Sequence, residues 1–233
     1  GPKHKNGYST AYFKPKSDNP NHMYWLGDPI IVEVGGKKKI WMFLNEWDVA
    51  RPFDKSFWIK YRSQAIAQMD AETLAIEKIV DLKNKSDEAV WGISLWLDDR
   101  KGKDLYIYGM RNEGDIKTAK RSALAMADKY KKLYVARTDA SKGLESVVDL
   151  KNWTAWDGKM FSKDLNNRKS IIAEMDSISD ELTIRRLNIN GKPTFVMVTF
   201  DTSVGYSDWK DLYLYSACEP QGPFTARHRF YTT

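Results

Sequence analysis

Thr194-Phe-Val-Met-Val-Thr-Phe200 is a strand-like run with apolar side chains on both of its faces. Val, Phe and Thr favour β-structure. A strand of this kind needs cover on both sides, as in a blade of a β-propeller. The strands of a two-sheet sandwich alternate instead between a buried face and a wet face. This stretch therefore favours a propeller over its structural rival, a β-sandwich.

The rest of the chain divides into similar strand-like runs, separated by turn signals such as Gly35-Gly36 and Asn190-Gly191. They fall into three groups of four, near residues 28–80, 91–149 and 180–231. Four antiparallel strands joined by hairpins make up one propeller blade. We expect an all-β fold, with an irregular segment over 1–24 and a β-propeller over 25–233. The predicted strands are 29–34, 40–44, 63–69, 74–80, 91–97, 105–108, 133–138, 144–149, 181–189, 194–200, 212–218 and 226–231.

Two segments interrupt this pattern. Residues 117–132 place Ala, Leu and Met among Lys and Arg without Gly or Pro, which predicts one short helical insertion. Residues 152–169 have few strand signals and are predicted to form a long connection, with a turn at Trp156-Asp-Gly158. Three blades do not close a ring. We expect a second chain, a missing segment, or strands hidden in 1–27 and 150–178 to complete it.

The composition limits the classes of partner. Aromatic residues make up 13% of the 233 residues, with nine Trp and twelve Tyr, which suits sugar rings, bases or partner surfaces. The net charge is +6, but its densest run, Lys37–Lys39, is typical of a solvated hairpin tip, so no nucleic acid is expected. The three His have no metal-ligand spacing, and no metal or other cofactor is expected. No apolar run approaches the roughly 20 residues of a membrane helix, and no membrane partner is expected.

The hairpin from Asp28 to Glu46 carries the best candidate for catalysis. A turn centred near Lys37 pairs apolar residues on one face, and the next pair outward is Asp28 with Glu46. Their Cβ atoms would then lie within roughly 5 Å of each other. Two facing acids raise the pKa of one of them, as glycoside hydrolysis requires. The alternative is that both acids cap the hairpin and point to water or to Lys and Arg. The predicted apolar pairs are Val34 with Ile40, Val32 with Met42, and Ile30 with Leu44.

Several motifs, in their order along the chain, resemble the five-bladed propeller glycoside hydrolases of the group that includes the endo-D-arabinanases. The resemblance covers about residues 25–233 and implies a five-bladed propeller with its acids at Asp28 and Glu46. Glu46 departs from the Asp that is more usual there. The motifs are Trp25-Leu-Gly-Asp28, Phe43-Leu-Asn-Glu46, Val90-Trp-Gly92, Leu105-Tyr-Ile-Tyr-Gly109, Leu133-Tyr-Val-Ala-Arg137, Trp156-Asp-Gly158, Ser179-Asp-Glu181, Phe195-Val-Met-Val198, Tyr213-Leu-Tyr-Ser-Ala217, Gly222-Pro-Phe-Thr225 and Tyr231-Thr-Thr233.

Two functions remain open from the sequence. The first is a glycoside hydrolase that cleaves a polysaccharide, and the second is a non-catalytic propeller that binds glycan or protein through the same face. We expect a carbohydrate partner and a secreted or extracytoplasmic location, although no signal peptide is visible. The predicted acids are Asp28 and Glu46, with Trp25, Trp47 and Trp91 as aromatic contacts to sugar rings and Arg62, Glu181 and Tyr206 as ligands of hydroxyl groups.

Overall fold

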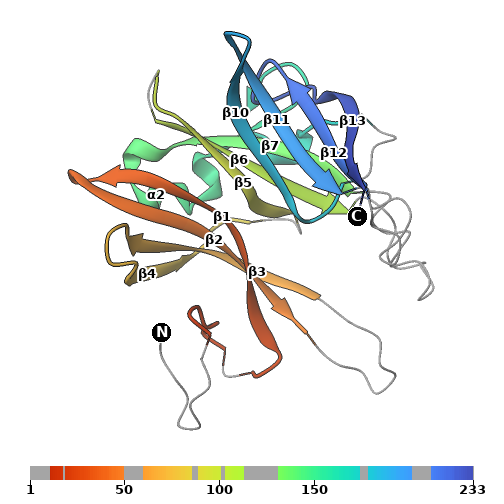
Figure 1. The fold of residues 1–233 in the computed structure, drawn as a ribbon. Helices are drawn as coiled ribbons and strands as arrows, with labels where there is room; N and C mark the ends of the chain where they lie inside the picture. Colours follow the sequence, from red (N-terminus) through yellow and green to blue (C-terminus); the bar gives the residue numbers. More distant parts are fainter. Residues whose placement is uncertain are drawn as a thin grey trace, which may run out of the picture.

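The computed structural model describes residues 11–17, 19–49, 60–85, 89–100, 103–112, 131–173, 178–200 and 211–232. These residues are mostly β-structure, arranged in three antiparallel sheets (Figure 1), so the expected all-β class is confirmed. Each strand pairs with the next one along the chain, so every sheet is a meander. No sheet closes on itself within the described part of the chain.

The three sheets follow one another in sequence. Sheet 1 consists of β1 (His22–Val34), β2 (Lys37–Asp48), β3 (Lys60–Asp70) and β4 (Ile76–Asp81). Sheet 2 consists of β5 (Val90–Asp98), β6 (Asp104–Asn112), β7 (Lys131–Asp139), β8 (Thr154–Trp156) and β9 (Phe161–Ser162). Sheet 3 consists of β10 (Leu182–Ile189), β11 (Lys192–Phe200), β12 (Asp211–Ala217) and β13 (Thr225–Thr232).

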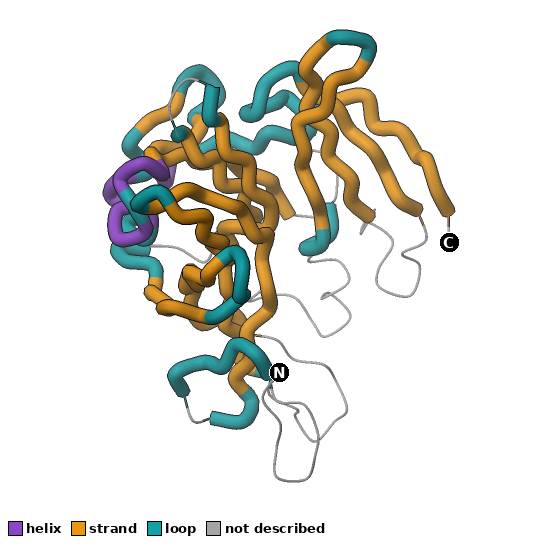
Figure 2. The backbone as a smooth tube through the Cα atoms, turned by 60° about the vertical axis from the view of Figure 1, so that its left-hand side comes forward, coloured by secondary structure: helices purple, strands orange, loops and turns teal. Residues whose placement is uncertain are grey.

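Sheet 2 lies between the other two sheets (Figures 1 and 2), and β5, its first strand, lies beside both β1 and β10. Two glycines permit the close approach of β1 and β5. A Cβ atom at Gly27 would lie 2.4 Å from the carbonyl oxygen of Gly92. Gly92 itself has a φ of +78°, and a Cβ atom there would lie 2.1 Å from Cγ of Phe43. The first strands of the three sheets are therefore the place where the sheets meet.

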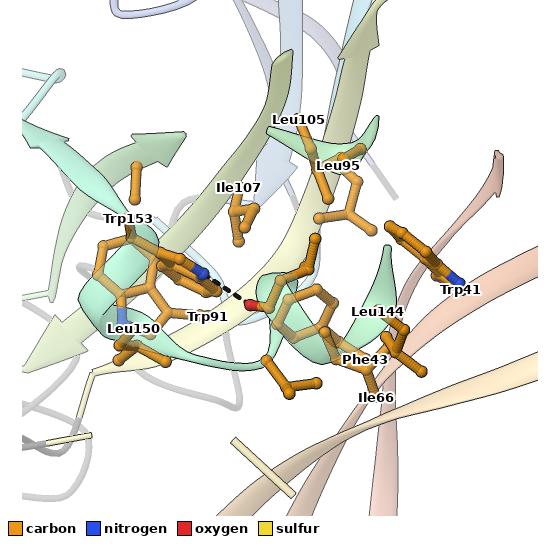
Figure 3. Packing of buried hydrophobic residues seen from close by; sticks show 14 of the residues in the cluster. Trp41, Phe43, Ile66, Trp91, Leu95, Leu105, Ile107, Leu144, Leu150 and Trp153 are labelled. Atoms are coloured by element: carbon orange, nitrogen blue, oxygen red, sulfur yellow. Dashed lines mark hydrogen bonds between the residues drawn. The ribbon is translucent and has the colours of Figure 1, made fainter. Parts of the chain in front are cut away.

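Apolar side chains fill the spaces between the sheets. Trp41, Phe43, Trp91 and Trp153 are buried between sheets 1 and 2 (Figure 3). Between sheets 2 and 3 lies a second cluster, which includes Tyr108, Phe195, Met197 and Tyr215. A third cluster, on the far side of sheet 1, contains Phe13, Leu44, Ala65, Ala67 and Met69. Sheet 1 thus buries both of its faces.

Every predicted strand except 144–149 overlaps an observed strand. Those residues form the short helix α2 (Leu144–Val147) and enter η4 (Leu150–Asn152), so this prediction was wrong. The Trp153 indole Nε1 donates a 2.7 Å hydrogen bond to the Val147 carbonyl oxygen at the end of α2 (Figure 3), which holds the helix against the core. The fourth and fifth strands of sheet 2 are instead β8 and β9, within the predicted connection 152–169.

Two further predictions differ from the structure at their edges. β1 begins at His22, inside the segment 1–24 that was expected to be irregular. Lys131 and Lys132 begin β7 rather than ending a helix. The other residues of the predicted helical insertion, 117–130, lie outside the described residues.

Candidate functional site

The register of the β1–β2 hairpin decides which side chains meet. Its loop is Gly35-Gly36, with φ values of +58° and +73°, and Val34 lies opposite Lys37. Two residues with positive φ form the tight turn that fits the twist of a hairpin, and glycine adopts that conformation without a steric cost. The predicted turn near Lys37 is therefore wrong, and the partners on the two strands are shifted by three residues.

This shift separates the two predicted acids. The residue opposite Glu46 is Tyr24, while Asp28 lies in an irregularity of the ladder between Leu26 and Pro29. Pro29, the residue after Asp28, lies opposite Met42, so Asp28 is about three residues, or about 10 Å, from Glu46 along the hairpin. The predicted pairing of Asp28 with Glu46 across the hairpin is wrong, and each acid has its own set of partners.

Asp28 belongs to a polar bridge between the three first strands. Its carboxylate accepts hydrogen bonds from Arg185 Nη1 and Nη2, at 2.8 and 3.0 Å. It also accepts from the Leu95 backbone N–H at 2.9 Å and from Ser94 Oγ at 3.2 Å. The Asp28 side chain is 11% exposed and that of Arg185 is 49% exposed. We call Asp28, Ser94 and Arg185 the inter-sheet bridge.

Glu46 belongs to a different cluster, at the end of sheet 1. One carboxylate oxygen accepts a 2.5 Å hydrogen bond from Ser63 Oγ, and the other lies 3.2 Å from His22 Nδ1. His22 Nε2 lies 3.9 Å from Oδ2 of Asp48, and the His22 side chain is only 6% exposed. We call His22, Glu46, Asp48 and Ser63 the acid cluster. Burial, followed by the negative charges of Glu46 and Asp81, raises the pKa of Tyr24 to about 12.

Three aromatic rings line the same end of sheet 1. Trp25 and Trp47 meet edge to face at 5.9 Å between ring centroids, and Trp47 meets Tyr61 in the same way at 5.7 Å. The Lys85 ammonium lies 4.5 Å from the centroid of the Tyr61 ring. Trp25 is 41% exposed. We call Trp25, Trp47 and Tyr61 the aromatic ladder. Because side chains alternate along a strand, Trp47 lies on the opposite face of sheet 1 from Glu46.

Buried polar atoms without a hydrogen-bond partner gather at this end. Among them, Trp47 Nε1 and Asp48 Oδ1 make no hydrogen bond with any residue in the described part of the chain. Arg62 Nη1 lies 3.8 Å from the other Asp48 oxygen, Oδ2. Buried polar groups are nearly always paired in folded proteins, so each of these two atoms, one on either face of the strand, marks a place for a polar ligand or for water.

The structure thus brings together four of the predicted site residues: Trp25, Glu46, Trp47 and Arg62. Sequence reasoning missed His22 and Asp48. The Gly35-Gly36 turn sets the register only as far as Pro29, and the shift between Leu26 and Pro29 brings His22 opposite Asp48, which no signal in the sequence indicated.

The remaining predicted residues lie elsewhere. Trp91 is 1% exposed and packs against Trp153, so the prediction that it contacts a sugar ring is wrong. Glu181 is exposed, one residue before β10 in sheet 3. Tyr206 lies outside the described residues.

One known family covers nearly the whole chain. The family model described as Domain of unknown function (DUF5005) matches residues 2–233. The chain belongs to the DUF5005 family. No curated protein matches this DUF5005 chain.

The described ranges of the DUF5005 domain contain neither a metal-binding group of side chains nor a helix that could span a membrane. Within them, no group of three or more His, Cys, Asp or Glu side chains has the geometry to hold a metal ion. Nor does any helix in those ranges have the length and apolar character needed to cross a membrane.

Proposed function

We propose that this chain binds a polysaccharide, without cleaving it, at the end of sheet 1 that carries the aromatic ladder and the acid cluster. The observation that carries the proposal is the exposed Trp25 ring, supported by Trp47 and Tyr61 beneath it. An indole offers a large, rigid apolar face at a small cost in conformational entropy. A row of edge-to-face rings holds that face in one orientation, ready to receive the flat side of a sugar ring.

The polar groups around the ladder support the same proposal. A sugar hydroxyl both donates and accepts hydrogen bonds. Trp47 Nε1, on the face of the ladder, is a donor without a partner in the described part of the chain, and Asp48 Oδ1, on the opposite face of the strand, is an acceptor without one. Arg62 is exposed beside Asp48 and adds further donors. Ligand sites typically combine apolar rings with a few polar groups.

The geometry favours binding over hydrolysis by the two acids predicted from the sequence. A catalytic carboxylate must offer an oxygen atom to the reacting atoms of the substrate. Both oxygens of Asp28 are occupied by Arg185, and one of them also accepts from Leu95 and Ser94. The register places Glu46 about 10 Å further along the hairpin. A retaining pair requires carboxyl groups about 5 Å apart and an inverting pair about 6.5–9.5 Å.

We further propose that the three sheets are blades of an incomplete β-propeller. The support is the order of the strands. Each sheet is a meander whose first strand lies at the common meeting point, where β5 touches β1 and β10. Propeller blades are arranged in this way around a central axis. A polysaccharide ligand would also accord with a secreted or extracytoplasmic location.

A polysaccharide-binding screen tests the proposal. Plant, fungal and bacterial polysaccharides are incorporated into native gels, and retardation of the wild-type protein is compared with that of Trp25→Ala. We expect retardation by at least one polysaccharide, a loss of affinity of about tenfold in Trp25→Ala, which is about 1.4 kcal/mol, and no release of reducing sugar. Phe230→Ala, which removes another exposed aromatic ring, should bind like wild type.

Absence of retardation by every polysaccharide, or equal retardation of wild type and Trp25→Ala, would overturn the proposed site. Release of reducing sugar by the wild-type protein would favour the hydrolase instead.

A further inference from the structure

The outer face of sheet 3 is the side that points away from sheet 2. Phe195, Met197 and Tyr215 point toward sheet 2, where they lie in the shared apolar cluster. Side chains alternate along a strand and opposed residues share a face, so the intervening residues form the outer face. Its apolar members include Leu187, Ile189, Val198, Phe200, Leu212, Leu214 and Tyr231, together with Val196, which is itself buried.

This outer face is open to solvent at its β10 side. Leu187 is 48% exposed, and Ile189 is exposed beside it. On β11 and β12, Val198 and Leu214 lie opposite each other and are only partly buried. Sheet 3 stands at the right-hand end of the structure in Figure 2, beyond sheet 2. Exposed apolar side chains gathered on one face of a sheet often mark an interaction site.

The corresponding face of sheet 1 is already covered. Phe13 packs there against the cluster of Leu44 and Met69 and is almost fully buried. The neighbouring Tyr12 hydroxyl donates to the Leu74 carbonyl oxygen, which ties this N-terminal segment to the sheet. Sheet 1 of one copy therefore cannot receive sheet 3 of another copy unless Phe13 is displaced. If two copies meet through sheet 3, the outer face must pair with itself.

We propose that the outer face of sheet 3 binds the same face of a second copy of this chain about a two-fold axis. The charges at its two ends support this partner. Glu181 precedes β10 by one residue, and Lys192 lies at the other end, opposite Ile189. A two-fold axis perpendicular to the strands brings Glu181 of each copy to Lys192 of the other. Arg185, between these ends, is already paired with Asp28, so it adds little repulsion.

The area of the outer face of sheet 3 sets the expected affinity of the dimer. Eight residues of β10 span about 26 Å, and four strands span about 19 Å across, which gives a flat area of about 500 Å² per copy. Specific interfaces bury about 800 Å² per partner, and weak transient ones less than about 600 Å². We therefore expect a dimer that dissociates on dilution. This inference does not depend on polysaccharide binding, which involves sheet 1 and not sheet 3.

Sedimentation velocity over a dilution series of the full chain tests the proposal. The wild-type protein should change from dimer to monomer as it is diluted. Leu187→Lys should be monomeric at every concentration, because it places a charge on both sides of the apolar contact. Ile31→Lys, which alters an exposed apolar residue of sheet 1, should dimerise like wild type. Circular dichroism of each variant confirms that it is folded.

A charge exchange tests the two-fold arrangement itself. Glu181→Lys and Lys192→Glu should each weaken the dimer about tenfold, and the double variant should recover most of the wild-type affinity. A wild-type protein that is monomeric throughout would overturn the proposal. So would a dimer that Leu187→Lys leaves intact, or a double variant that is weaker than either single one.

Discussion

Asp28 and Arg185 form a two-pronged ion pair that joins β1 to β10, with bonds of 2.8 and 3.0 Å. Ser94 connects both residues to β5, because its hydroxyl bonds to Asp28 and also accepts from Arg185 Nη1 at 3.2 Å. The same hydroxyl accepts from the Ile184 backbone N–H at 2.9 Å. One polar bridge therefore links the first strands of all three sheets, and it gives Asp28 a structural role.

Asp28→Asn should destabilise the fold. The substitution removes the charge opposite Arg185 and one of the acceptors of its guanidinium group. Hydrogen bonds to charged groups contribute about 1.5–3 kcal/mol, and the half-exposed Arg185 regains part of this from water, so we expect a loss of about 1–2 kcal/mol. Urea unfolding of wild type, Asp28→Asn, Arg185→Gln and the double variant measures the coupling. Additive single effects would contradict the bridge, and Glu33→Gln, which alters an exposed acid of β1, should unfold like wild type.

Glu46→Gln should lower the pKa of Tyr24 below its value of about 12. The Glu46 charge is the second cause of that high pKa, after burial, so the value should move toward 10 without reaching it. Carbon-13 NMR of labelled tyrosine follows the titration, and Tyr24→Phe assigns the resonance. The onset of ionisation should occur at lower pH in Glu46→Gln than in wild type.

This titration also tests the register of the hairpin. Asp28→Asn should leave the Tyr24 titration where it is in wild type, because the residue opposite Glu46 is Tyr24 and Asp28 has other partners. An equal response of Tyr24 to Asp28→Asn and to Glu46→Gln would contradict the register observed here.

The hairpin explains why the strands were predictable and the site was not. The sequence pattern identified β1 and β2, but it allowed more than one pairing, because β2 is apolar on both faces. Trp41 and Phe43 point toward sheet 2, and Leu44 points toward the Phe13 cluster. A strand with two apolar faces does not specify its register, and a shift by an odd number of residues exchanges the faces. The conformation of Gly35-Gly36 decides between the pairings.

Sheet 2 contains a strand that is too short to be predicted from the sequence. Its fourth strand, β8, has only three residues and pairs with β7 through Ala155 and Thr154, which is too short for an alternation to be recognised. The more strand-like Val147 and Val148 lie instead at the end of α2, where both are fully buried. Packing against the core outweighs their β-propensity, which depends on context.

Gly92→Ala should destabilise the protein far more than Gly191→Ala. Both glycines have a φ of +78°, so the conformational cost of alanine is similar, about 1 kcal/mol. A Cβ atom at Gly92 would overlap the buried Phe43 ring, whereas nothing lies within 4 Å of one at Gly191. Overpacking adds about 1–3 kcal/mol, so we expect a loss of about 2–4 kcal/mol for Gly92→Ala. Thermal and urea unfolding measure both, and similar losses would contradict the close packing of β5 against Phe43 of β2.

The turn that follows β3 should make the fold sensitive to acid. Asp70 accepts hydrogen bonds from the Thr73 and Glu72 backbone N–H groups and from Lys39, and these bonds hold its pKa well below the usual range, with Thr73 the largest cause. Lys39 also donates to Glu77, whose pKa is lowered by that bond. An acid with a lowered folded-state pKa stabilises the fold above its unfolded value, about 3.9 for Asp and 4.3 for Glu.

Stability should therefore be lost as the pH falls below about 4.5 toward 2, and Asp70→Asn should lose less over this interval than wild type does. The midpoint of thermal unfolding, measured at a series of pH values for both proteins, gives the comparison. Glu33→Gln, which alters an exposed acid of sheet 1, serves as the control and should keep the wild-type dependence. Parallel curves for wild type and Asp70→Asn would show that Asp70 is not a source of the acid sensitivity.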